Sequence, residues 1–284
     1  MNNLAHGLAQ LCRHNRDGSH ATQANRRKGL KAIATDLYDL GYKVESPNSL
    51  KPKHVHSLVL HWRARGLTST TMKNRVAWMR WWAEKVNKAS VIPRDNVELG
   101  IAPSPAANDN RAWQLDEQQQ LPCEFAQASL KLIEAFGLRV EEAIKIKPQQ
   151  ADQTVLLQLQ GSWTKGGRAR QLPISTPKQK AALDYAKEVA GSGALIPAHK
   201  SYIQQRKTFD HQTLKAGLRN LHGLRHAFAQ QRYQELTGWE APKNGGPSKS
   251  RLTPSEMKLD RWARKIIAEE LGHSRISITK IYVG

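Results

Sequence analysis

Apolar residues recur at helical spacing along most of this 284-residue chain. Over residues 22–40 they fall three or four positions apart, which predicts a helix with one buried face: Leu30, Ile33, Leu37 and Leu40. A shorter helix is predicted over residues 52–65, ended by Gly66. Residues 1–20 are polar and only weakly patterned, so no element is predicted there.

A third helix is predicted to begin after a cap at Thr68 or Ser69 and to continue through TTMKNRVAWMRWWAEKVNK. Its apolar face is expected to pack inward: Met72, Trp78, Met79, Trp82 and Val86. Its basic side chains are expected to point outward: Lys73, Arg75, Arg80 and Lys85. The tryptophans could stack on nucleic-acid bases, but this spacing favours a core or groove-edge position for them.

Residues 101–112 contain two prolines and small residues without periodicity, which predicts an exposed linker. It separates a helical domain, residues 1–100, from a second domain, residues 113–284. In the second domain, VLLQLQ followed by GSWTKGGRARQLPIS predicts a β-hairpin, and most of the remaining segments have helical patterns. The predicted fold is therefore mainly α with a small antiparallel β-sheet.

Positive charge dominates the composition, with 44 Lys and Arg against 24 Asp and Glu and a net charge of +20. Residues 1–112 carry 18 basic and 8 acidic side chains and residues 113–284 carry 26 and 16, so each part has a net charge of +10. Both domains are thus expected to contact a polyanion, and nucleic acid is the first candidate. A basic protein without such a partner is the simpler alternative.

The compartment is predicted from absences in the sequence. No apolar run approaches the roughly 18 residues that a membrane span needs, and the first residues lack the apolar core of a signal peptide. Cys12 and Cys123 are expected to be reduced thiols. These features predict an intracellular, cytoplasmic protein without a membrane partner.

Four clusters in the second domain carry chemically useful side chains: FGLRVEEAIKI, TKGGRARQLPIS, LHGLRHAF and LGHSRISITKIY. Each has an ordinary structural interpretation when taken alone. Arg139 and Glu142 have the spacing of a surface ion pair, and Lys165 could be a solvated hairpin residue. His222 and Arg225 share one helix face. In the last cluster Ile276, Ile278 and Ile281 are expected to pack inward.

Together, in the order Arg, Lys, His-x-x-Arg, His, Tyr, these clusters resemble the tyrosine recombinase family of phage and mobile-element integrases and dimer resolvases. The matching residues are Arg139, Lys165, His222, Arg225, His273 and Tyr282. The resemblance covers the second domain, which would be the α+β catalytic domain. It extends more weakly to the first domain, which is similar to the family's helical, SAM-like core-binding domain.

The resemblance implies cleavage and rejoining of DNA strands, with Tyr282 as nucleophile. Arg139 and Arg225 would clamp the phosphate, and Lys165 would protonate the leaving 5′-oxygen. The histidines would bind the phosphate or assist proton transfer, and Glu142 would support an arginine. Lys73, Arg75, Arg80, Lys85 and Arg168 are candidate DNA contacts.

No metal or ATP is expected, because the bond energy would be kept in a 3′-phosphotyrosyl link and no HExxH, paired CxxC or P-loop motif is present. Expected partners are double-stranded DNA with recombination sites and three further copies of the chain, exchanging strands through a Holliday junction. A monomer in solution and accessory DNA-bending or directionality factors are compatible with this scheme. The expected source is a bacterium or phage, with the protein on the nucleoid.

Three alternatives stay open: resolution of chromosome or plasmid dimers, type IB topoisomerase chemistry, and a regulator that binds DNA without cleaving it. Tyr233 is the alternative nucleophile. Two features depart from the family: an insertion at residues 236–265, expected to form a loop and a helix, and only Val283 and Gly284 after the tyrosine. The family's tail packs onto a neighbouring protomer, so either the chain is cut or another contact is used.

Overall fold

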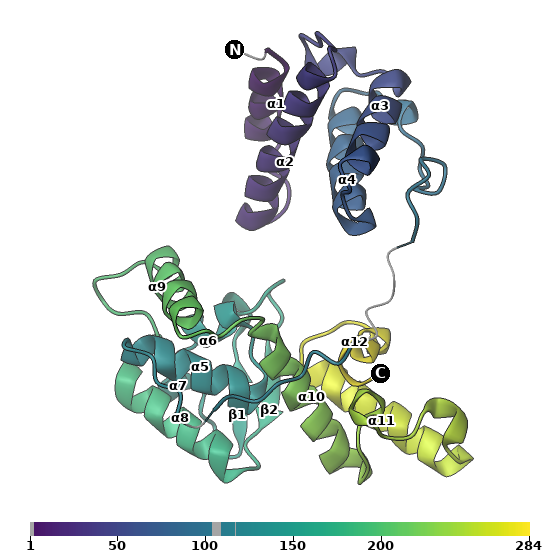
Figure 1. Cartoon of the computed structure of the whole chain (residues 1–284). Helices are drawn as coiled ribbons and strands as arrows, with labels where there is room; N and C mark the ends of the chain where they lie inside the picture. The colour runs from purple at the N-terminus through teal and green to yellow at the C-terminus, as the bar shows by residue number, and fades with distance from the viewer. Residues whose placement is uncertain (1–2, 104–108, 117) are drawn as a thin grey trace. The chain divides into compact units, whose positions relative to one another are not determined.

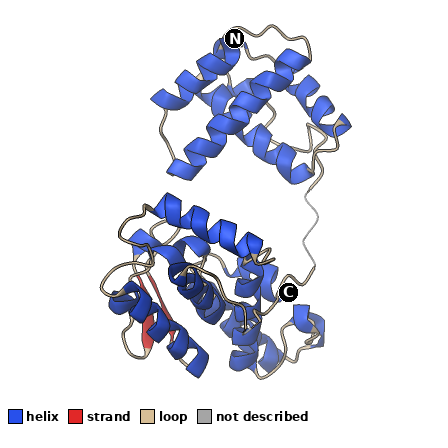
Figure 2. Ribbon diagram, turned by 60° about the vertical axis from the view of Figure 1, so that its left-hand side comes forward, coloured by secondary structure: helices blue, strands red, loops and turns tan. Residues whose placement is uncertain are grey.

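The computed structural model describes residues 3–103, 109–116 and 118–284 of the chain (Figures 1 and 2). The chain forms two compact units, Met1–Ala106 and Ala107–Gly284. The centre of the predicted linker, residues 104–108, lies outside the described residues. In the described ranges every helix is too short or too polar to cross a bilayer. The predicted fold class, helical with a small antiparallel sheet, is confirmed.

The first unit packs its helices around an apolar core that contains Trp62 and Trp82. Its described α-helices are α1 (Asn3–His14), α2 (His20–Asp39), α3 (Pro52–Ala64) and α4 (Ser69–Lys85). The hydroxyl of Thr68 accepts a hydrogen bond from the amide of Thr71 and so caps α4, as the sequence predicts. Helices α2, α3 and α4 begin and end close to the positions that the sequence predicts.

Helix α1 was not predicted, and the expectation of an unpatterned segment at residues 1–20 is wrong. Leu4, Leu8 and Cys12 are buried on one face of this helix, spaced by four residues. Three apolar positions separated by polar and small residues give a weak signal in the sequence. The helix is stabilised because this apolar face packs against α2.

The four basic residues of α4 are half-buried instead of pointing freely into solvent, in contrast to the prediction. Arg75 forms an ion pair of 2.6 Å with Asp36, a buried carboxylate that also accepts a hydrogen bond from the indole of Trp62. Arg80 donates two hydrogen bonds to the carbonyl oxygen of Pro93. Burying Asp36 requires partners for its charge, so Arg75 serves the core of this unit.

The second unit carries most of the secondary structure. Its described α-helices are α5 (Glu124–Phe136), α6 (Val140–Lys145), α7 (Pro148–Ala151), α8 (Pro177–Ala190), α9 (Tyr202–Lys215), α10 (His222–Thr237), α11 (Pro254–Glu270) and α12 (Lys280–Val283). Helix α5 packs against α8 and α10, and α10 contacts α11 and α12. Figure 1 shows α10, α11 and α12 grouped on one side of this unit.

The hairpin consists of β1 (Leu156–Leu159) and β2 (Arg170–Pro173), which pair antiparallel. Leu157 faces Leu172 and Leu159 faces Arg170 across the ladder, and these four side chains are buried. Because side chains alternate between the faces of a strand, this register turns Arg170 inward. The turn before β2 contains Lys165, which is exposed.

The end of the chain differs from its prediction. Only Ile278 of the three isoleucines packs against the core, whereas Ile276 is 36% and Ile281 52% exposed. The prediction is wrong because the chain does not continue as one helix after α11: a short 3-10 turn, Ile276–Thr279, precedes α12. That break turns Tyr282 and Val283 into the core instead.

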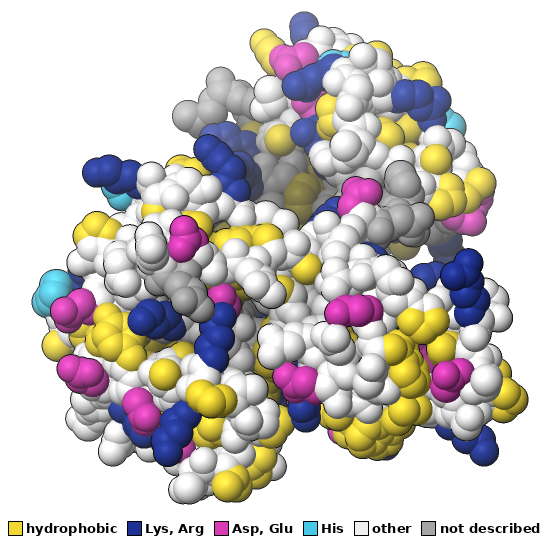
Figure 3. Space-filling view, turned by 60° about the horizontal axis from the view of Figure 1, so that its bottom comes forward, with side chains coloured by type: hydrophobic (Ala, Val, Ile, Leu, Met, Phe, Trp, Pro, Cys, Tyr) yellow, Lys and Arg dark blue, Asp and Glu magenta, His cyan; other side chains and the backbone are white. Residues whose placement is uncertain are grey.

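Lysine and arginine side chains are exposed on both units (Figure 3). Both cysteines are free thiols in the structure, Cys12 buried and Cys123 half-buried.

A tight contact in the first unit gives a stability test. A Cβ atom added to Gly29 would lie 2.1 Å from a ring carbon of Trp78. We expect Gly29→Ala to lower the free energy of unfolding by about 1–3 kcal/mol, because overpacking outweighs the better helix propensity of alanine. Urea denaturation measures the change, with Lys28→Ala on the exposed side of α2 as control. A Gly29→Ala protein as stable as the control would contradict the contact.

Candidate active site

Glu142 anchors the first cluster of charged groups. Its side chain has no exposed surface, and its two oxygens accept hydrogen bonds from Arg139 at 2.8 Å and from Arg170 at 3.0 and 2.7 Å. The backbone amide of Arg139 also donates to it, in a capping box at the start of α6. Burial alone would raise the pKa of this carboxyl, but Arg170 and Arg139 hold it at about 2.

Arg225 lies on α10 and is completely buried. Its guanidinium donates to the backbone carbonyls of Gly137 and Leu271, which come from the ends of α5 and α11. Burial, together with the charge of Arg139, lowers its pKa to about 10, so it remains a cation at neutral pH. A buried cation held by dipoles rather than by a carboxylate can still attract an anion.

Tyr282 lies on α12, and its phenol oxygen is 3.2 Å from Nε2 of His222. The phenol ring is 4% exposed, and the Arg225 guanidinium carbon lies 5.9 Å from its centroid. His222 begins α10, where burial and the charges of Arg225 and Arg139 lower its pKa. A neutral imidazole at this position can accept the proton of the phenol.

Three imidazoles surround the Tyr282 ring. The ring centroids of His226, His273 and His222 lie 4.6, 5.5 and 5.8 Å from that of Tyr282. Burial and neighbouring cations lower the pKa of His226 and of His273 to about 4. All three rings are therefore neutral at pH 7, and Nδ1 of His226 and Nε2 of His273 are buried without a hydrogen-bond partner in the described structure.

Gly223 explains part of the HGLR motif. A Cβ atom at this position would lie 2.2 Å from the ring of Trp113 and 2.4 Å from the carbonyl oxygen of Arg111. The segment that enters the second unit thus crosses directly over the start of α10. The Trp113 indole donates a hydrogen bond to the Asn220 carbonyl at 3.0 Å, which fixes this crossing.

The structure therefore brings five of the six candidate residues into one cluster: Arg139, His222, Arg225, His273 and Tyr282. Lys165 is exposed on the hairpin turn. Arg168 is exposed on the same hairpin, at a depression of about 490 Å³ that Arg170 and His273 also line.

Sequence reasoning missed two residues of this site. Arg170 forms the bidentate pair with Glu142, and its Nε donates to the Glu270 carbonyl at 2.7 Å. The alternation of the second hairpin strand could have indicated it as an inward-facing cation. His226 follows His222 by one helical turn, so the spacing in HGLRH places both on one face of α10.

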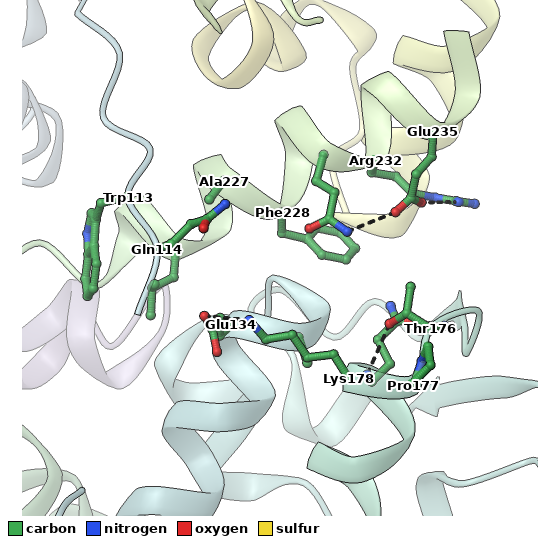
Figure 4. A pocket seen from close by; sticks show the side chains of 14 residues that line it. Trp113, Gln114, Glu134, Thr176, Pro177, Lys178, Ala227, Phe228, Arg232 and Glu235 are labelled. Atoms are coloured by element: carbon green, nitrogen blue, oxygen red, sulfur yellow. Dashed lines mark hydrogen bonds and ion pairs between the residues drawn. The ribbon is translucent and has the colours of Figure 1, made fainter. Parts of the chain in front are cut away.

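A second hollow, of about 190 Å³, lies between α5, α8 and α10 (Figure 4). Trp113 lies on one side of it. Two ion pairs line it, Glu134–Lys178 at 2.8 Å and Arg232–Glu235 at 3.0 Å. It contains none of the candidate catalytic residues. Within the described ranges no three His, Cys, Asp or Glu side chains are placed to hold a metal ion.

Both units of the chain match known protein families. A sequence model of the phage integrase N-terminal domain matches residues 1–89, and an integrase model matches residues 105–231. The two models together cover well over half of the chain. This chain belongs to the phage integrase family of tyrosine recombinases. The integrase match includes Arg139, Lys165, His222 and Arg225 and ends before His273 and Tyr282.

Solved structures share the integrase fold at low sequence identity. An integrase of the Tn1549 transposon, in complex with circular intermediate DNA, is 14% identical with a TM-score of 0.58, covering 98% of this chain and 95% of that chain. A lambda integrase dimer bound to a core site is 16% identical with a TM-score of 0.60, covering 99% and 76%.

The XerH recombinase bound to its difH substrate is 15% identical with a TM-score of 0.59, covering 99% of this chain and 81% of that chain. A search of curated protein sequences gave no significant match. The structural likeness establishes the shared fold.

The lowered pKa of His226 predicts a pH dependence of stability. Because the folded protein binds this proton more weakly than the unfolded chain does, stability falls as the pH drops from about 6.5 towards 4, by at most about 1.4 kcal/mol per pH unit. We expect His226→Asn to have a shallower slope over this range in urea denaturation. His211→Asn, on the exposed side of α9, should keep the wild-type slope. Parallel slopes for all three proteins would contradict a neutral buried His226.

Proposed function

We propose that this protein is a site-specific DNA recombinase that cuts and rejoins DNA strands through a 3′-phosphotyrosyl intermediate. The observation that carries the proposal is the 3.2 Å contact between the Tyr282 phenol and Nε2 of His222, beside the buried cation of Arg225. A nucleophile, a proton acceptor and a phosphate-binding charge are thereby placed within one cluster. Membership of the integrase family supports the same activity.

In the first step the phenol oxygen of Tyr282 attacks the phosphorus of a DNA phosphodiester. Its proton passes to Nε2 of His222, which is neutral because its pKa is lowered. Arg225 and Arg139 stabilise the charge that develops on the non-bridging oxygens. Since the phenol is 4% exposed, the side chains around it have to shift before a phosphate can reach it.

The bond that breaks joins phosphorus to the 5′-oxygen, which needs a proton as it leaves. Lys165 is the proposed donor, because its ammonium lies on an exposed hairpin turn with glycines at the next two positions. Both glycines have positive φ, at 80° and 71°, which lets the turn approach a backbone closely. The lysine would enter the site as the hairpin meets DNA.

Strand exchange is the reverse reaction on a new strand. A 5′-hydroxyl from a second DNA duplex attacks the phosphotyrosyl phosphorus and releases Tyr282. The phosphodiester energy is retained in the covalent intermediate, so this scheme needs neither ATP nor a metal ion. Four protomers on two duplexes would pass through a Holliday junction; a lambda integrase tetramer has been solved on such a junction.

The two units have separate proposed roles. Residues 1–100 form the core-binding domain and residues 113–284 the catalytic domain, joined by the linker at 101–112. Among the candidate DNA contacts, Arg168 is exposed near His273, whereas Lys73 and Lys85 are half-buried and Arg75 and Arg80 already have protein partners. The hairpin contact is therefore the better supported of these sites.

The biological role that we propose is integration or excision of a phage or another mobile element. The Tn1549 integrase, with which the chain shares 14% identity over 98% of its length, is a transposon protein. Dimer resolution is the second candidate, since XerH is described on its difH substrate and has the same fold. Strand exchange assays between circular and linear DNA separate the two roles.

Tyr282→Phe tests the nucleophile. A DNA substrate nicked so that the cut strand dissociates should trap wild-type protein as a covalent adduct, visible as a shifted band in denaturing gels. We expect Tyr282→Phe to form no adduct, because it lacks the attacking oxygen, and to bind the DNA with unchanged affinity.

Tyr233→Phe is the matched control. The Tyr233 phenol is fully buried, donates a 2.6 Å hydrogen bond to Asp260 and has its pKa raised to about 12 by burial and that hydrogen bond, so it is a poor nucleophile. We expect this variant to keep the adduct. Strong DNA binding without any wild-type adduct would favour a regulator that does not cleave, and an adduct retained by Tyr282→Phe would remove Tyr282 from its role.

Lys165→Ala tests the general acid. We expect cleavage of ordinary DNA to slow by about 100-fold or more, because the 5′-oxygen then leaves without a proton. A substrate with sulfur in place of that 5′-oxygen should be cleaved at nearly the wild-type rate, since a thiolate is a good leaving group. Lys180→Ala, on the exposed face of α8, is the control. Equal loss on both substrates would assign Lys165 to DNA binding instead.

A further inference from the structure

The helix that carries Tyr282 depends on other elements for its position. Helix α12 has only four residues, too few to be stable by itself. Two of its backbone carbonyl oxygens, and the carbonyl oxygen of the residue after it, accept hydrogen bonds from three side chains. Lys243 donates to Ile281 at 2.8 Å, Gln230 to Tyr282 at 2.9 Å and Arg264 to Gly284 at 2.6 Å.

Two of these donors are shared with the segment that enters the second unit. The amide nitrogen of Gln230 also contacts Oδ1 of Asn110 at 2.8 Å, and Nδ2 of Asn110 contacts Oε1 of Gln230 at 3.5 Å. The ammonium of Lys243 contacts the Asp109 carbonyl at 3.4 Å. Each donor therefore joins residue 109 or 110 to a carbonyl of α12.

We propose that Gln230 and Lys243 are positioning residues that couple the interdomain connection to the nucleophile. Asp109 and Asn110 are the first described residues of the second unit, so a displacement transmitted along the chain from the first unit would act on them. Through the two donors it then acts on the backbone of Ile281 and Tyr282. Cleavage would thus be efficient only when the connection takes the path that holds Tyr282 in place.

Burial gives the Gln230 contact its strength. Gln230 is 5% exposed, so water cannot replace its bonds to Tyr282 and Asn110 when they break. The same segment is fixed further along by Trp113, which donates to Asn220 and packs over Gly223 beside His222. The connection therefore touches the elements that carry both the nucleophile and its proposed proton acceptor. Small changes in such an alignment have large effects on rate.

The role assigned to Lys243 accounts for part of the 236–265 insertion. Lys243 lies in a 3-10 turn, Pro242–Asn244, directly after Ala241 in the core. Atoms of Pro242 and Lys243 lie 2.8 and 3.1 Å from the place where a Cβ atom on Gly284 would be. Residues of the insertion thus pack against the end of α12. The coupling rests on the proposed function, since it matters only if Tyr282 is the nucleophile.

Gln230→Glu removes the shared donor and keeps the shape of the side chain. The new carboxylate repels the Tyr282 carbonyl, so we expect the single-turnover rate of adduct formation to fall by about tenfold with an unchanged DNA dissociation constant. Gln234→Glu introduces the same charge one turn later, at an exposed position of α10, and should react at the wild-type rate. Asn110→Ala and Lys243→Met should each slow adduct formation, and Asn110→Ala should add little to a Gln230→Ala protein.

Hydrogen exchange of DNA-free protein tests the coupling without any reaction. We expect the peptide 276–284 to exchange faster in Gln230→Glu and Asn110→Ala than in wild type and Gln234→Glu, with equal melting temperatures showing that the variants are folded. Unchanged exchange in both variants would overturn the coupling, whatever the enzyme does. Faster exchange with a wild-type cleavage rate would overturn the positioning role. A wild type that forms no adduct would instead refute the proposed function, and the exchange data would still decide the contact.

Discussion

Glu142 has no exposed surface, and its carboxylate holds Arg139 and Arg170 in fixed positions at the edge of the site. A buried carboxylate without cationic partners would be strongly unfavourable, so these charges constrain one another. Through Arg170, Glu142 connects the start of α6 to the second strand of the hairpin. Arg170 also donates to the Glu270 carbonyl at the end of α11. These contacts fix the positions of α6, β2 and the end of α11 relative to one another, although the three elements are distant in the sequence.

Arg225 lies among backbone dipoles, donating to the carbonyls of Gly137 and Leu271, and forms no ion pair with a carboxylate of the described residues. The resulting positive field explains why the imidazoles around Tyr282 are neutral at pH 7: burial and nearby guanidiniums both disfavour a further positive charge. Neutral imidazoles can accept a proton from the phenol and hydrogen-bond to a phosphate. One electrostatic arrangement therefore supports both proposed properties of the site, the binding of an anionic substrate and the activation of Tyr282.

Most of the candidate residues could be predicted because each has a local signature. HGLRH places His222 and Arg225 on one helix face, and Arg139 precedes a glutamate at capping-box spacing. Arg170 was missed because its importance comes from strand register, and its partner Glu142 is 28 positions away in the sequence. His226 was missed because a second histidine on a helix face is usually structural. The helix α1 was missed for lack of a strong apolar pattern.

The sequence by itself determined the helical class, the positions of most helices and the hairpin, and the set of residues that resembles an integrase site. These features depend on interactions within a few positions of the chain: periodicity, caps and turns. Only the tertiary structure decided that Tyr282 is turned inward while Ile276 and Ile281 are exposed, and that Gln230 and Lys243 donate to the backbone of α12. A four-residue helix has no orientation of its own, so contacts from distant segments decide where its side chains point.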